Sequence, residues 1–278
     1  MAAGPGVSVR PAVRRRPRVF RLYGSFPVAA YIAVAVTAFL AMFAAWWLAA
    51  AADLASSFFL PSPGDVWHRA RELVGDGTLW QDTKVSFVRI MIGWLISTAV
   101  GVPVGILMGT LRPAEAALEP AIDFIRYMPA VAFVPLTIVW VGVGENQKYL
   151  IIFIGTFFQQ ALMVMDNVKR VPHEYVDIGR TLGMRESTIL ARIVIPAAAP
   201  ALWDTLRITI GWAWTWLVVA ELDAANNGLG HRIITAQRFF ETDTIFVGIL
   251  TIGILGLIID TAMKVAGGRL FRWAETRR

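Results

Sequence analysis

The sequence contains no cysteine among its 278 residues, which excludes disulfides, thiolate metal sites and cysteine nucleophiles. Only three histidines occur, His68, His173 and His231, and they are too scattered to predict a metal cluster. The chain also lacks a glycine-rich phosphate loop ending in Lys-Ser/Thr. We therefore expect no metal site, no catalytic residue and no cofactor bound by this chain.

Charged residues are few, at 17%, whereas 56% of the residues are hydrophobic. The apolar runs are too long for strands and have the length of membrane-crossing helices. The pattern predicts an all-α polytopic membrane protein. Its six predicted transmembrane helices lie at about residues 27–52, 85–109, 121–143, 149–165, 200–222 and 244–266.

The basic residues divide unequally between the two sides that six spans define. The N-terminal arm, the 110–120 turn, the 166–196 segment and the C-terminal end from Lys264 hold 17 Lys and Arg, whereas the three opposite loops hold 6. Basic loops remain in the cytoplasm, so both termini are predicted to be cytoplasmic. The net charge of +6 is then a property of membrane loops, and no nucleic-acid partner is expected.

Residues 1–26 carry six arginines and no acid, which predicts a basic cytoplasmic arm able to lie on anionic lipid of the bilayer. Two alternatives remain open. Arg14, Arg15 and Arg16 resemble part of a twin-arginine export signal, and the first apolar run resembles a cleavable signal peptide. A signal peptide has a shorter apolar core, of about 7–15 residues, which favours a true span.

Glycines follow a close-packing pattern in the second predicted span. Gly101, Gly105 and Gly109 are four residues apart, a small-xxx-small spacing that lets two helices approach closely. Pro103 lies among them and is expected to kink this span.

The segment 171–196, VPHEYVDIGRTLGMRESTILARIVIP, separates two apolar runs and is rich in charge. Its apolar residues recur at helical spacing in two stretches. Pro172 suits a first helical turn, Gly183 suits the turn after a helix, and Pro196 is expected to stop the second helix. The segment is therefore predicted to be a helix, a glycine turn and a second helix.

This segment resembles the cytoplasmic coupling loop, or EAA loop, of ABC importer permeases, in the branch for nitrate, sulfonates, taurine and bicarbonate. Gly183 and Pro196 match the family spacing, while Asp177 fills the Glu position, and Ile178 and Gly179 replace the two alanines. The resemblance implies ATPase-coupling residues Asp177, Thr181, Leu182, Gly183, Met184, Arg185, Glu186 and Pro196.

The resemblance further implies a type I ABC importer permease fold in the bacterial inner membrane, with a six-helix domain over 27–266 and a basic cytoplasmic tail over 267–278. The expected partners are a second permease copy, two cytoplasmic ATPase subunits that use ATP and Mg, and an extracytoplasmic solute-binding protein. The expected substrate is a small anion such as nitrate, bicarbonate, taurine or another sulfonate, imported by alternating access.

A pathway for a polar solute needs hydrogen-bonding groups that face a cavity. The candidates for the pathway or its gate are Arg126, Met128, Pro129, Gln159, Gln160, Trp212, Thr215 and Glu221. Gln159 and Gln160 are adjacent, so at most one points inward. Arg89, near the end of its span, is expected to snorkel to the interface.

An ion-coupled secondary transporter and a membrane enzyme are the alternative functions. The first favours carboxylates near mid-span and inverted repeats, and the second needs a convergent His/Asp/Glu cluster. The acids here lie toward the span ends.

Overall fold

The computed structural model describes residues 27–52, 56 and 58–274, and these residues form helices and connecting turns without a strand. The basic arm and the last four residues lie outside the described part. The chain divides into two units, residues 1–55 and 56–278. The first unit contributes α1, Val28–Ala51, an apolar helix of 24 residues in which none is buried. This helix confirms the first predicted span.

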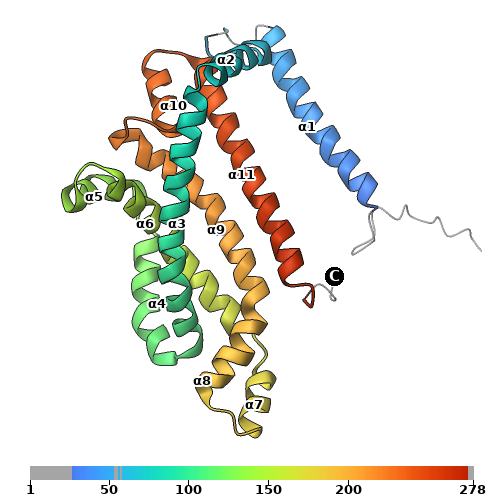
Figure 1. The fold of residues 1–278 in the computed structure, drawn as a ribbon, viewed down its shortest axis with the longest axis vertical. Helices are drawn as coiled ribbons and strands as arrows, with labels where there is room; N and C mark the ends of the chain where they lie inside the picture. The colour runs from blue at the N-terminus through green and yellow to red at the C-terminus, as the bar shows by residue number, and fades with distance from the viewer. Residues whose placement is uncertain (1–26, 53–55, 57, 275–278) are drawn as a thin grey trace, which may run out of the picture. The chain divides into compact units, whose positions relative to one another are not determined.

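The second unit is a bundle of long helices with short helices at its two ends (Figure 1). Its long helices are α3, Thr78–Thr110, α6, Glu145–Lys169, α9, Ile195–Ala224, and α11, Thr242–Leu270. Figure 1 places α2, Pro63–Gly75, and α10, Leu229–Arg238, at one end, and α7, His173–Thr181, and α8, Glu186–Ile189, at the other. We call these the α10 end and the α7 end. The remaining helices are α4, Arg112–Arg126, the 3-10 turn Ala130–Phe133, and α5, Val134–Val141.

The described residues contain five helices long and apolar enough to cross a membrane, or six if α4 and Ala130–Val141 form one broken span. The third predicted span, 121–143, is therefore not one continuous helix, because the two segments that cover it meet at 92°. Pro129 lies at the break; it has no N–H to donate and disfavours helical backbone at the residue before it. The predicted 110–120 turn is wrong, since α4 begins at Arg112.

Pro196 does not end the helix, contrary to the prediction. α8, the π-helical segment Leu190–Val194 and α9 follow one another, and the apolar helix extends over Glu186–Leu222. Pro196 is the second residue of α9, which follows the π-helical segment directly. The π turn just before it changes the hydrogen-bond register, a feature that often marks functional sites.

The predicted glycine packing is confirmed between α3 and α6. A Cβ built on Gly105 would lie 2.5 Å from the Ala161 carbonyl oxygen and 2.6 Å from Val164 Cβ, and one on Gly109 would lie 2.8 Å from Val168 Cβ. The helix backbones are thus too close for a side chain at these positions. This contact fixes α6, which lines the cavity described below, against α3.

We expect Gly105→Ala to lower the stability of the bundle by about 1–3 kcal/mol, because the added methyl group overpacks the contact with α6. Gly211→Ala is the matched control: Gly211 is also inside a helix, and nothing lies within 4 Å of its built Cβ. Thermal unfolding of the two detergent-purified variants measures the difference. Equal melting temperatures would show that the α3–α6 contact relaxes freely.

Candidate transport cavity and coupling loop

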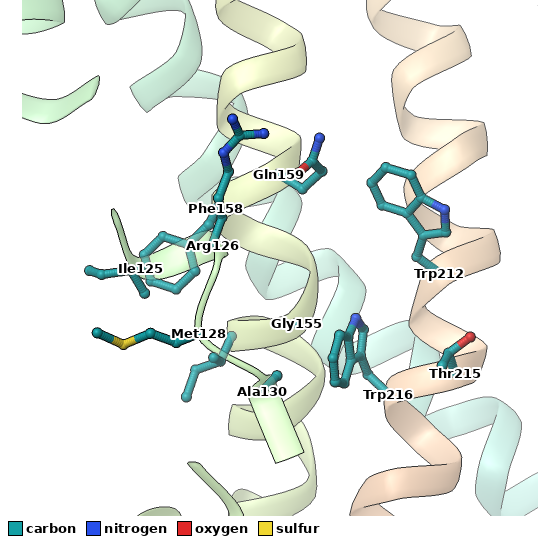
Figure 2. A pocket seen from close by; sticks show the side chains of 11 residues that line it. Ile125, Arg126, Met128, Ala130, Gly155, Phe158, Gln159, Trp212, Thr215 and Trp216 are labelled. Carbon is teal, nitrogen blue, oxygen red and sulfur yellow. The ribbon is translucent and has the colours of Figure 1, made fainter. Parts of the chain in front are cut away.

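A cavity of about 280 Å³ lies among the break after α4, α6 and α9 (Figure 2). The α4 side contributes Arg126 and Met128, and α6 contributes Phe158 and Gln159, one helical turn from Gly155. Helix α9 contributes Trp212, Thr215 and Trp216. The complete lining is Ile125, Arg126, Met128, Ala130, Ile154, Gly155, Phe158, Gln159, Trp212, Thr215 and Trp216.

Arg126 is the charged residue of this lining. Its Nε lies 2.9 Å from Asp123 Oδ1, one helical turn earlier, and its Nη2 donates to the Tyr127 hydroxyl at 3.1 Å. The guanidinium also lies over the Tyr127 ring, 4.7 Å from its centroid. In Figure 2 the Arg126 side chain extends toward Gln159, while Trp212 and Trp216 face them from α9. The cavity therefore combines one cation, two neutral polar side chains and aromatic walls.

The structure brings five of the eight pathway candidates to this cavity: Arg126, Met128, Gln159, Trp212 and Thr215. Gln160 points away, accepts from Ser97 at 2.8 Å and donates to Thr98 at 3.0 Å, which binds α6 to α3. Pro129 lies at the break and does not line the cavity, and Glu221 lies elsewhere. Sequence reasoning missed Phe158 and Trp216, although both follow other lining residues at the i+3 or i+4 spacing of one helix face.

Glu221 belongs to a buried ion-pair cluster at the α10 end. Arg89 Nη1 donates to Glu221 Oε1 at 2.7 Å, and Arg89 Nη2 and Nε donate to the two oxygens of Glu145 at 2.6 and 2.7 Å. The Arg89 side chain is 2% exposed and that of Glu221 is 0% exposed. The prediction that Arg89 snorkels is therefore wrong, because two carboxylates compensate its charge inside the bundle.

The same cluster holds the start of α10. Gly230 N–H donates to Glu221 Oε2 at 2.8 Å, Leu229 N–H to Ser86 Oγ at 2.9 Å, and Gly228 N–H to Asp82 Oδ1 at 2.8 Å. These N–H groups have no partner within α10 because they lie at its first turn. Side chains of α3 and α9 thus act as the cap of α10 and fix its position.

The coupling segment at the α7 end has the predicted helix–turn–helix form. Helix α7 ends at Thr181, and Gly183 follows with φ 71°, the left-handed backbone that glycine adopts most easily. Gly183 N–H donates to Arg180 O at 2.9 Å and Met184 N–H to Gly179 O at 3.0 Å, the paired bonds of a Schellman motif. The turn is therefore a firm helix end.

An ion pair spans this turn. Arg180 Nε donates to Glu186 Oε1 at 2.8 Å, and Arg180 Nη1 lies 3.6 Å from Asp177. The hydrogen bond to Glu186 raises the pKa of the Arg180 guanidinium above its ordinary value, so the side chain keeps its charge at physiological pH. Gly179 faces inward, where a Cβ would lie 2.9 Å from Ile189 Cγ1, so α7 packs closely on the following helix.

The outer face of α7 is apolar and exposed. Tyr175, Ile178 and Leu182 are 46%, 57% and 73% exposed and lie three or four residues apart, on one side of the helix. Six of the eight predicted coupling residues are also exposed in the α7–α8 turn or just beside it: Asp177, Thr181, Leu182, Gly183, Arg185 and Glu186. Met184 is half-buried against the core, and Pro196 is exposed on α9.

Comparisons with known proteins identify the family of the chain. Residues 101–272 match the family model described as binding-protein-dependent transport system inner membrane component. A probable ABC transporter permease protein of Brucella abortus (strain 2308) is 39% identical over 216 residues, 78% of this chain and 86% of that protein. The taurine transport system permease protein of Escherichia coli K12 is 32% identical over 258 residues, 91% of this chain and 94% of that protein.

The fold also resembles solved structures. A methionine ABC transporter in an inward-facing conformation superposes with a TM-score of 0.60 at 19% identity, over 70% of this chain and 95% of that one. The likeness at this identity concerns the fold, which is that of ABC importer permeases.

Proposed function

Because the chain belongs to the family of binding-protein-dependent transport system inner membrane components, we propose that it forms the pathway for a small solute with a second copy of itself. Its family makes it an ABC importer permease subunit in the bacterial inner membrane, a multi-pass transport protein rather than an enzyme or an ion-coupled transporter.

The exposed apolar face of α7 carries the proposal that this end contacts an ATPase. Tyr175, Ile178 and Leu182 project from a helix whose end is fixed by the Gly183 turn and the Arg180–Glu186 ion pair. Large apolar side chains exposed outside the apolar spans mark a protein contact. Two cytoplasmic ATPase subunits, which bind ATP and Mg, would receive one α7 each. The α7 end and both termini would then be cytoplasmic.

A second copy would complete the pathway next to the cavity. Tyr127, Val131 and Val139 around the α4–α5 break are 75%, 53% and 80% exposed, and this face adjoins the lining residues Met128 and Ala130. Two copies facing each other here would enclose the cavity between them. ATP-driven movement of α7 would open it alternately to the two sides, with a solute-binding protein delivering substrate at the α10 end.

The proposed solute is a small anion. Arg126 gives the cavity a positive charge, and the relative with 32% identity is named for taurine transport. Taurine, another sulfonate, nitrate and bicarbonate are the expected class.

The test is co-purification of the chain with an ATPase subunit encoded beside its gene. Leu182→Asp places a charge on the apolar face and should weaken ATPase binding roughly thirtyfold or more, the effect of losing about 2 kcal/mol at an interface hot spot. Gly183→Arg should do the same, because an ordinary residue costs about 1–2 kcal/mol in the left-handed backbone and carries bulk into the contact. Leu270→Asp is the control, since Leu270 is an exposed leucine, at 59%, on α11.

The proposal predicts that wild type and Leu270→Asp retain the ATPase and that both turn variants lose it while still inserting into the membrane. Equal recovery of the ATPase with all four chains would remove the coupling role of α7. Failure of the wild type to bind any ATPase would remove the assembly itself.

A further inference from the structure

The cavity has the chemistry of a site for an organic anion. Seven of its eleven lining residues are apolar, and its polar side chains are Arg126, Gln159 and Thr215, so no carboxylate is among the lining residues. A bare inorganic ion needs few apolar contacts, and a volume of about 280 Å³ holds roughly nine waters at ~30 Å³ each. The site therefore has room for a charged head and a short carbon body.

The guanidinium of Arg126 keeps binding capacity for such a head. Arg126 Nε forms an ion pair with Asp123, and Nη2 donates a hydrogen bond to the Tyr127 hydroxyl. In the part of the chain that the structure describes, Nη1 has no protein partner. The side chain is 30% exposed. An arginine presents donors in a fork that matches the oxygens of a sulfonate or carboxylate.

We propose that this cavity binds a small organic monoanion of the sulfonate type through Arg126, an inference that rests on the proposed role of the cavity in transport. The oxygens of the anion accept hydrogen bonds from Arg126 Nη1 and the Gln159 amide, which lie beside each other in Figure 2. The carbon body lies between Phe158 of α6 and the rings of Trp212 and Trp216 of α9. These aromatic walls select against bicarbonate and nitrate, which have no apolar part.

Asp123 is the counter-ion of Arg126 in this structure. Its carboxylate competes with the incoming anion for the same guanidinium, 2.9 Å away. Removing the Asp123 charge should therefore strengthen anion binding, and removing the Arg126 charge should weaken it. Asp123 and Arg126 are one helical turn apart, and their substitutions have opposite predicted effects on anion binding. A general loss of structure would instead weaken anion binding in both variants.

The experiment titrates butane-1-sulfonate, by calorimetry, into the full chain in nanodiscs. Arg126→Gln should weaken binding by at least about tenfold, since a hydrogen bond to a charged group is lost. Asp123→Asn should tighten it severalfold. Arg112→Gln, at the other end of α4 and outside the cavity lining, should leave it unchanged. Bicarbonate and the neutral butyl methyl sulfone, used as the second and third probes, should bind much more weakly than butane-1-sulfonate.

Equal affinity of Arg126→Gln and Arg112→Gln would overturn the site, as would equal binding of the neutral sulfone or no binding by the wild type at millimolar concentration. Co-purification of the ATPase with each variant keeps this separate from the proposed function. If Arg126→Gln retains both the ATPase and the sulfonate, the site is wrong and the permease assignment stands.

Discussion

Replacing Arg89 with methionine is expected to cost about 3–5 kcal/mol and to leave little folded protein, because it strands a buried carboxylate. Glu221 has no exposed side-chain surface and would lose its cationic partner at 2.7 Å. It would keep only the hydrogen bonds from Ser86 and from Gly230 N–H. These neutral donors cannot replace a charge inside the bundle.

The double variant Arg89→Met with Glu221→Met should recover part of this loss, because it removes the stranded charge but also removes the acceptor of Gly230 N–H. It removes both charges of the buried pair, and buried ion pairs can often be replaced by apolar residues without loss of stability. Glu145 keeps its contact with Lys148 at 3.2 Å, and its own side chain is 48% exposed. The freed Asn227 is exposed to solvent, so water can replace its bonds to Arg89.

The measurement is the fraction of detergent-extracted chain that remains monodisperse on gel filtration, together with its melting temperature. Glu145→Gln is the control and should cost much less than Arg89→Met, because a half-exposed carboxylate is already solvated. A single Arg89→Met variant as stable as the wild type would contradict the role of the cluster. So would a double variant no better than the single one.

This cluster also shows what sequence patterns leave out. An arginine inside an apolar run was visible in the sequence, but its partners Glu145 and Glu221 are 56 and 132 residues away. Periodicity gives the face of a helix on which a residue lies, and it does not give the helix that packs there. Snorkelling was therefore the natural expectation, and only the tertiary contacts of α3 with α6 and α9 reverse it.

Local features were predictable where their cause is local. The Gly183 turn follows from the backbone freedom of glycine, and the close α3–α6 contact follows from the spacing of Gly101, Gly105 and Gly109. The bend after α4 lies at Pro129, and its size, 92°, does not follow from the apolar length of 121–143. Proline disfavours helical backbone at the residue before it, and this local effect breaks the helix within an apolar segment.

The cavity was predictable only in part. Polarity identified Gln159, Thr215 and Arg126, whereas the apolar wall around Phe158 and Trp216 differs in no way from core residues in sequence. Trp214, between two lining tryptophans of α9, is buried in the core instead. The alternation shows that residue type selects candidates and that helix geometry decides among them.

Gly228→Ala is expected to be the most damaging alanine substitution among the glycines that the structure describes. Gly228 precedes α10 with φ 109° and ψ 165°, a backbone region essentially restricted to glycine, so any side chain costs about 1–3 kcal/mol there. An added Cβ would also collide with the carboxylate of Glu221. Because Glu221 is held by Arg89, Ser86 and Gly230, it has no free direction in which to move.

We expect the two effects together to cost at least about 3 kcal/mol and to detach α10 from the bundle. Gly183→Ala separates them, since Gly183 also has a positive φ, 71°, but nothing lies within 4 Å of its built Cβ. Melting temperatures of the two variants should therefore differ clearly, with Gly228→Ala the lower. If both melt together, Glu221 yields to the methyl group, and the cluster is less rigid than its hydrogen bonds imply. If only Gly228→Ala lowers the melting temperature strongly, the anchoring of α10 depends on a close backbone approach that only glycine permits. The surface proposed to receive the binding protein is then held in place by the same buried charges that join the spans.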